Sequence, residues 1–313
     1  MENENIIGFM RKTCEDNGVP FQETVQTITQ SHIARNDRYN FVKEMKHQGN
    51  DFYYYEIQKP IKDLKTVVES FFKKYFKSDY VAKLRKILLL NKNKLYFIIE
   101  KNSDSELLIG DMMFEYEQFS KIEDRVKLCI QITNAVIEIR SKLKEKGQDP
   151  SLYGLSTQKF NYSISNKKVE FINIGLDEFL VATSDTNDRK FWPPEKFTLT
   201  MKNIDKYKLD IYSLGCIFFE IISGHFPLEE DSNAALDLIK NKAQKLVSEE
   251  CEKMLIRELE NFNKKDQLIK LIDDMTTLEV SNRNIKFEEV QNILNSLLLP
   301  DYPQKKLSKC LFI

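Results

Sequence analysis

The sequence contains little glycine: nine of its 313 residues, and no two of them lie closer together than seven positions. Three motifs that position phosphates or nucleophiles need much closer pairs: the dinucleotide-binding G-x-G-x-x-G, the Walker A loop and the G-x-S-x-G elbow. The backbone at those sites must turn sharply or approach a phosphate with no Cβ in the way. The spacing therefore excludes all three motifs.

Patterns that bind metal or form disulfides are also missing. The three histidines are scattered, so there is no H-E-x-x-H zinc helix, and the five cysteines include no C-x-x-C pair. An odd, dispersed set of cysteines without a recognisable signal peptide is typical of reduced thiols in the cytosol. The strongest apolar run, Ile211 to Ile222, contains Glu220 and is too short to cross a bilayer. We therefore expect a cytoplasmic protein with no metal site.

Charge of either sign is nearly balanced, with 47 Lys and Arg against 48 Asp and Glu, for a formal net charge of −1. That balance gives no broad electrostatic attraction to nucleic acid, so we expect no nucleic-acid partner. Hydrophobic residues make up 42% of the chain and include 21 Phe and 13 Tyr. This composition is typical of a globular protein with a sizeable core.

The first hundred residues favour a β-rich region that carries one helix. Residues 1–20 are polar, and we expect a loose lead-in or a short helix there. Aromatic and β-branched residues then dominate, with turns at 49–51 and 91–93. Apolar residues at three- and four-residue steps indicate the helix. The predicted elements are strands at Thr27–Thr29, Tyr39–Met45, Phe52–Ile57, Val81–Leu90 and Leu95–Glu100, and a helix at Lys62–Phe76.

The remainder of the chain is predicted to be mostly helical, which makes the fold class α+β. Ser120 and Glu123 have the spacing of a capping box, and the helix that they open should end near Gly147. Ile211–Ile222 is apolar on nearly every side, which is typical of a helix buried at the centre of a lobe. A final amphipathic helix contains Phe287, Val290, Leu294 and Leu297, and the chain beyond Pro300 should be extended.

Three segments in this helical part resemble eukaryotic protein kinases in order and spacing. Asp210 to Pro227 looks like the central buried helix of that family. Trp192 to Glu195 (W-P-P-E) resembles its A-P-E motif, and Arg283 resembles the arginine that pairs with the motif's glutamate. The resemblance covers about residues 25–298 and implies a two-lobed protein-kinase-like fold, with a small antiparallel β lobe carrying one helix and a larger, mainly helical lobe. It implies a lead-in at 1–24, a small lobe at 25–100, a large lobe at 101–298 and a flexible tail at 299–313.

The residues that would hold nucleotide in this family are replaced in the small lobe. The three glycine positions of the phosphate-binding loop fall on about Arg35, Asp37 and Asn40. The strand lysine falls on Gln58, which carries no charge. Lys59 is adjacent, and a one-residue bulge in the strand would bring it inward.

The catalytic loop H-R-D-L-x-x-x-N aligns with residues 153–160. Leu155 then replaces the catalytic Asp, and Phe160 replaces the metal-binding Asn. Sliding the frame by one or two residues recovers Asn161 at best and never an Asp. Asn173 replaces the metal-binding Asp of D-F-G and is a poorer magnesium ligand, and Asp177 would substitute for it only through a rebuilt turn.

Several charged residues could have either a structural or a functional role. Glu195 with Arg283 favours a buried structural pair, and Asp210 is expected to tether a neighbouring loop. Glu69 on the small-lobe helix is either a solvated charge or a partner for a strand lysine. If the chain binds nucleotide, Lys59, Glu69 and Glu100, at the end of the last small-lobe strand, are the residues that would contact it.

The chain ends in Cys310-Leu-Phe-Ile313, which has the pattern of a C-a-a-X prenylation box with three lysines just upstream. A single prenyl group anchors only marginally, and a basic patch is the expected second signal. The alternative is a free cysteine beside a hydrophobic end that packs on the large lobe.

Together these observations lead to two hypotheses of different classes. The first is a catalytically inactive kinase-like domain, a pseudokinase, that needs no cofactor and acts through a protein partner as a regulator or scaffold, with a tail that places it at the membrane periphery if prenylated. The second is a divergent but active Ser/Thr protein kinase that uses ATP and magnesium, with Lys59, Asn161 and Asp177 in displaced roles. A small-molecule phosphotransferase would need the same two aspartates, those of the catalytic loop and of D-F-G. Leu155 and Asn173 replace them, so this third function is not supported.

Overall fold

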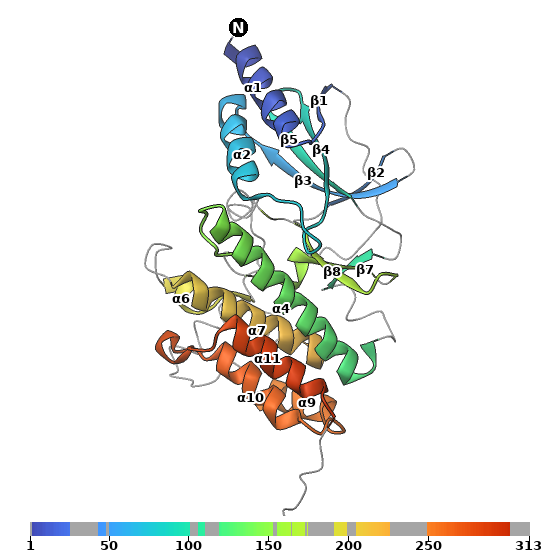
Figure 1. The fold of residues 1–313 in the computed structure, drawn as a ribbon, viewed down its shortest axis with the longest axis vertical. Coiled ribbons are helices and arrows are strands. Elements are labelled where there is room, and N and C mark those ends of the chain that lie inside the picture. The colour runs from blue at the N-terminus through green and yellow to red at the C-terminus, as the bar shows by residue number, and fades with distance from the viewer. Residues whose placement is uncertain are drawn as a thin grey trace, which may run out of the picture.

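The computed structural model of the chain describes residues 2–25, 43–47, 50–100, 106–109, 119–152, 155–163, 165–172, 174, 191–198, 205–225 and 249–300. The fold is α+β, as predicted. A five-stranded sheet with two helices lies at one end of the molecule, and the other described helices lie toward the opposite end (Figure 1).

The larger sheet has the strand order β1-β4-β5-β3-β2. Its neighbours are antiparallel except for β1 and β4, which run parallel. The predicted strands at 52–57 and 95–100 are confirmed, and that predicted at Val81–Leu90 is confirmed from Leu84 onward. Thr27–Thr29 and the first part of Tyr39–Met45 lie outside the described residues. The strands are β1 (Phe21–Thr24), β2 (Lys43–His47), β3 (Asn50–Gln58), β4 (Leu84–Leu90) and β5 (Lys94–Glu100).

A tight turn joins β4 to β5 where the sequence predicts one. Asn91 and Lys92 have φ angles of +49° and +58°, and the Asn93 N–H donates to the Leu90 carbonyl at 3.2 Å. Positive φ at both central residues is the feature of type I′ hairpin turns, whose twist matches that of the flanking strands. The turn therefore holds Lys92 at the end of the sheet.

Two helices cover one face of this sheet. In α2 (Ile61–Lys74), the apolar residues at three- and four-residue steps are buried, as the sequence predicts. Helix α1 (Glu2–Asp16) packs against α2 and buries Met10 and Cys14 completely. Because β1 follows directly and joins the sheet, residues 2–24 are integrated into the β-rich part rather than leading loosely into it.

The helical part is built around α7 (Lys206–Ser223), which contacts α4, α9 and α10. Every residue of α7 from Leu209 to Ser223 is buried, so the predicted central helix is confirmed. The predicted final helix is also confirmed, with its four apolar residues buried. The other elements are α4 (Ile122–Glu145), α6 (Glu195–Thr198), α9 (Glu249–Glu258), α10 (Lys265–Thr276), α11 (Phe287–Leu298), and a three-stranded sheet β6 (Glu106–Leu108), β7 (Phe160–Ser163) and β8 (Lys168–Phe171).

The two ends of α4 differ in how well the sequence predicts them. The predicted capping box at Ser120 and Glu123 is wrong, because the helix begins one residue later, with Lys121 at the N-cap and no side-chain cap. Glu123 is then one position too early to reach back. The predicted end is confirmed: Gly147 has φ +67°, and the N–H groups of Gly147 and Gln148 donate to the carbonyls of Lys144 and Leu143, each at 2.9 Å. This is the Schellman arrangement that glycine favours.

Candidate functional site

The segment aligned with the kinase catalytic loop enters the hydrophobic core. Leu155 is only 1% exposed and belongs to the main core cluster. Phe160, the first residue of β7, is fully buried, and its ring meets Phe171 edge-on at a centroid distance of 5.2 Å. Neither side chain can accept a proton or ligate a metal, because both consist of carbon and hydrogen alone.

The residues between these two are polar but contain no carboxylate. Ser156, Thr157 and Gln158 are buried, and their side-chain oxygen and nitrogen atoms have no hydrogen-bond partner within the described part of the chain. The Lys159 Nζ donates to the Leu152 carbonyl at 3.4 Å. Among the described residues of this loop, no carboxylate is therefore present to accept a proton from a hydroxyl group.

Two carboxylates that contact the neighbourhood of this loop have structural partners. Asp149 accepts a hydrogen bond from the Ser151 N–H at 2.9 Å and pairs with Lys206. Asp210 is completely buried, and its Oδ2 accepts from the Leu152 N–H at 2.9 Å and from Arg140 Nη1 at 2.7 Å. Asp210 thus tethers the loop to α7, as the sequence analysis expects. Asp177 and Asn173 lie outside the described residues.

Arg140 is a residue of this site that the sequence analysis missed. Its guanidinium lies 4.8 Å from the Tyr207 ring centroid and 4.9 Å from that of Phe287, and it is mostly buried. It therefore links α4, α7 and α11 beside the tethered loop. One sequence signal could have found it: Arg140 directly follows Ile139, which belongs to the apolar face of the predicted helix. A charge beside a buried face is expected to have a buried partner of opposite charge.

Glu195 and Arg283 form the buried pair that the resemblance implies. Arg283 Nη1 lies 2.7 Å from Glu195 Oε1, and the two side chains are 0% and 6% exposed. Arg283 also donates to the Thr277 carbonyl at 2.8 Å and 3.1 Å and to the Lys208 carbonyl at 3.1 Å. The pair joins α6 to the loop before α11 and holds both against α7.

The structure does not bring together the residues predicted to contact nucleotide. Gln58 and Lys59 are exposed at the end of β3, where Gln58 pairs with Lys94 and the Lys59 N–H donates to the Asn93 carbonyl at 3.0 Å. Glu100 is at the opposite end of β5, about 20 Å away at ~3.4 Å per residue. Lys59 and Glu100 therefore cannot contact the same small phosphate group.

Glu69 and Glu100 each have partners close by. Glu69 lies 3.9 Å from Lys65 one helical turn earlier, with both side chains about a third exposed. Glu100 is mostly buried and pairs with Arg85 and, at 3.8 Å, with Lys83. Glu69 thus behaves as the solvated charge of the first interpretation, and Glu100 fastens β5 to β4.

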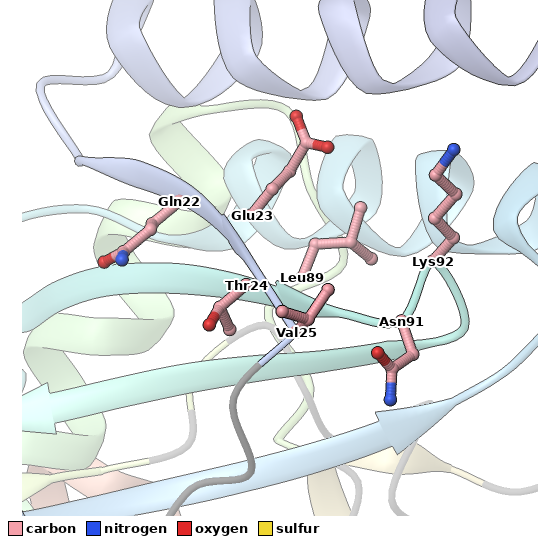
Figure 2. A pocket seen from close by; sticks show the side chains of 7 residues that line it. All are labelled: Gln22, Glu23, Thr24, Val25, Leu89, Asn91 and Lys92. Carbon is pink, nitrogen blue, oxygen red and sulfur yellow. The ribbon is translucent and has the colours of Figure 1, made fainter.

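Two pockets lined by described residues lie away from the aligned catalytic positions. One, of about 700 Å³, is at the end of β1 beside the β4–β5 turn (Figure 2), and the other, of about 560 Å³, is between α10 and α11. No group of three or more His, Cys, Asp and Glu in the described ranges is arranged to hold a metal ion. No helix in those ranges is long and apolar enough to cross a membrane.

Comparison of the chain with protein-family models gives no match, and comparison with curated proteins gives none either. The kinase resemblance therefore rests on the residues and contacts described above.

Proposed function

We propose that this chain is a two-lobed, protein-kinase-like domain without catalytic activity, a pseudokinase, which acts as a regulator or scaffold for a protein partner. Three features support the fold assignment: a sheet with α2 between β3 and β4, the central buried helix α7, and the contacts made by Asp210 and by the Glu195–Arg283 pair. Each is a feature that the kinase resemblance implies. The added α1 and β1 depart from the expectation of a single helix in the small lobe.

The observation that carries the proposed inactivity is the burial of Leu155 at the position of the catalytic Asp. Phosphoryl transfer depends on positioning and charge neutralisation, so it needs a carboxylate for the substrate hydroxyl and oxygen ligands for magnesium. Leu155 and Phe160 supply neither, and both are held in the core by packing. ATP with magnesium therefore does not fit the described residues.

Calorimetry of ATP binding to the purified full chain tests this proposal. We expect no magnesium-dependent heat at millimolar ATP, measured once with magnesium and once with a chelator. Circular dichroism on the same sample shows that the chain is folded, and an active protein kinase serves as the positive control.

The alternative is the divergent, active Ser/Thr kinase that uses Lys59, Asn161 and Asp177. Magnesium-dependent binding that is lost in Lys59→Ala but kept in Lys62→Ala would favour it. Lys62 is a matched control because it is an exposed lysine on α2, close to Lys59 in the chain. The burial of Asn161 within β7 argues against its reaching a metal.

We further propose that a prenyl group on Cys310, which lies outside the described residues, places the protein at a cytoplasmic membrane face. The test is the mass of the chain after incubation with a prenyl transferase and its lipid donor. A mass increase of one prenyl group that is absent in Cys310→Ser supports the tether, and an unchanged mass contradicts it. The upstream lysines would supply the second, electrostatic signal.

A further inference from the structure

The outer edge of β1 carries backbone hydrogen-bonding groups that no other described strand uses. The Pro20 carbonyl accepts from the Ile87 N–H at 3.0 Å, and the Thr24 carbonyl accepts from the Asn91 N–H at 3.4 Å. Because alternate residues of a strand direct their N–H and C=O to the same side, those of Phe21 and Glu23 point away from β4. Within the described part of the chain, β1 is the edge of its sheet and has no strand on that side.

Natural proteins usually protect such an edge with charge, proline or a covering element. The only charge on β1 is Glu23, whose carboxylate lies 2.5 Å from Arg11 Nη2 of α1. Figure 2 shows the Glu23 side chain extending toward the helices, to one side of the strand. The charge is therefore neutralised within the chain and does not stand across the free edge.

A pocket of about 700 Å³ adjoins this edge, where β1 ends beside the β4–β5 turn (Figure 2). Val25 is 84% exposed there, more than any other large hydrophobic residue that the structure describes. The side-chain amides of Gln22 and Asn91 also line the pocket and have no hydrogen-bond partner among the described residues. The pocket thus offers both apolar contact and hydrogen bonds.

The pocket carries a positive charge that nothing in the described chain balances. Lys92 lines it from the turn, and its ammonium has no acidic partner among the described residues. Glu23 is the only acidic residue of the pocket, and Arg11 already neutralises it. A carboxylate on an incoming ligand would complement Lys92.

We propose that the free edge of β1 and this pocket bind an extended peptide segment of a partner protein, which adds as a strand beside β1 and places an acidic side chain near Lys92. Strand addition takes its affinity from main-chain hydrogen bonds and its specificity from side-chain pockets. Since β1 has four residues and directs two of them outward, binding should be weak and transient. The proposal does not rest on the kinase resemblance, because β1 and the turn are not among the residues that carry it.

The test uses the full chain and synthetic hexapeptides that alternate Val and Thr, with one Asp moved through each position. A second set carries Lys in place of Asp. Fluorescence anisotropy measures affinity, and amide chemical shifts of the isotope-labelled chain locate the peptide. We expect Asp peptides to bind at least about threefold more tightly than their Lys counterparts, as one partly exposed ion pair would give, with shifts confined to residues near 21–25 and 89–92.

Two variants at Glu23 separate the backbone from the side chain. Glu23→Pro removes the outward N–H yet leaves the β1–β4 hydrogen bonds intact, since proline is accepted on an edge strand at such a position. Glu23→Gln is the matched control, because it also loses the pairing with Arg11 but keeps the N–H. We expect Glu23→Pro to weaken binding about tenfold or more through the lost hydrogen bond and the bulk of the ring, and Glu23→Gln to change it by less than about twofold.

A third variant tests the charge. Lys92→Asn keeps a residue that tolerates positive φ and should weaken Asp-peptide binding about two- to fivefold. If circular dichroism shows that Glu23→Pro does not fold, the proposal is judged on two results alone: the affinity of Lys92→Asn for Asp peptides and the location of the chemical-shift changes. Absence of binding by every peptide, or equal affinities of the Pro and Gln variants, would overturn the proposal. So would dimerisation of the chain through β1, detected by sedimentation and abolished in Glu23→Pro, because the occupant would then be a second copy.

Discussion

Replacing Arg283 by Met should destabilise the protein strongly, because Arg283 joins three elements of the helical part. Its guanidinium is fully buried, donates to Glu195 and to the carbonyls of Thr277 and Lys208, and lies 4.7 Å from the ring centroid of Tyr212. Met fills a similar volume but leaves the Glu195 carboxylate buried without its guanidinium. Removing one member of a buried ion pair costs about 3–5 kcal/mol, a large part of the ~5–15 kcal/mol by which domains are stable.

Urea unfolding measures this loss, with the fluorescence of Trp192 as the reporter. Trp192 is the only tryptophan of the chain and lies three residues before Glu195. The unfolding midpoint should fall by about 1 M or more, given a urea dependence of ~3 kcal/mol per molar. The matched control is Arg257→Met on the exposed side of α9, which should change the free energy of unfolding by less than about 0.5 kcal/mol.

A double variant shows whether the buried charge is the cause. Glu195→Leu added to Arg283→Met removes the stranded carboxylate and should recover part of the loss, since hydrophobic replacements of buried pairs are often neutral. A loss below about 1 kcal/mol for Arg283→Met, or a double variant less stable than the single one, would show that the buried charge is not the cause of the lost stability.

Three further predictions follow from the packing and burial. Leu155→Ala should lower the free energy of unfolding by about 2–5 kcal/mol in a urea titration. Leu155→Asp should lower it further and confer no phosphotransfer activity. A stable and active Leu155→Asp variant would contradict the placement of Leu155 in the hydrophobic core. Gly215→Ala should lower the free energy of unfolding by about 1–3 kcal/mol, because a Cβ there would lie 2.7 Å from Thr276 Cγ2 and 2.8 Å from Met275 Cβ. A thermal midpoint equal to that of the original chain would instead show that α7 and α10 can move apart at little cost. Burial raises the pKa of the Cys14 thiol to about 12 and raises the pKa values of Cys129 and Cys216 as well, so the folded state favours the neutral thiols. The free energy of unfolding should therefore be steady below about pH 8.5 and fall as the pH rises toward 10, because only the unfolded chain ionises its thiols there. Urea titrations that show a rise over that interval would contradict this prediction.

Local patterns predicted the individual elements well. The periodicity of α2, α7 and α11 and the turn residues of the β4–β5 hairpin depend on neighbours in the sequence, and these elements appear where the sequence predicts them. The predicted start of α4 was wrong because a Ser and a Glu three residues apart form a capping box only if the helix begins directly after the Ser. Packing decides where the helix begins, and the spacing alone does not show it. Here Arg125 Nε donates to the Phe119 carbonyl at 2.6 Å, across the point where the helix begins.

Contacts between distant parts of the chain were harder to predict. The parallel pairing of β1 with β4 and the packing of α1 on α2 are not encoded in any short pattern, so the sequence of residues 1–20 predicts only a loose lead-in or a short helix. The contact between Glu195 and Arg283 spans 88 positions and was reached only through the kinase resemblance. Lys59, Glu69 and Glu100 were grouped by that same resemblance, and strand register separates Lys59 from Glu100.

The proposed lack of catalytic activity is tested most directly by a phosphotransfer assay of the full chain with radiolabelled ATP and magnesium, on itself and on a pool of Ser- and Thr-containing peptides. We expect no transfer above that of a heat-unfolded sample, because Leu155 and Phe160, which align with the catalytic Asp and the metal-binding Asn of the kinase motif, are buried apolar side chains. Magnesium-dependent transfer that is lost in Asp177→Ala would contradict it. The protein would then be an active kinase with displaced metal ligands.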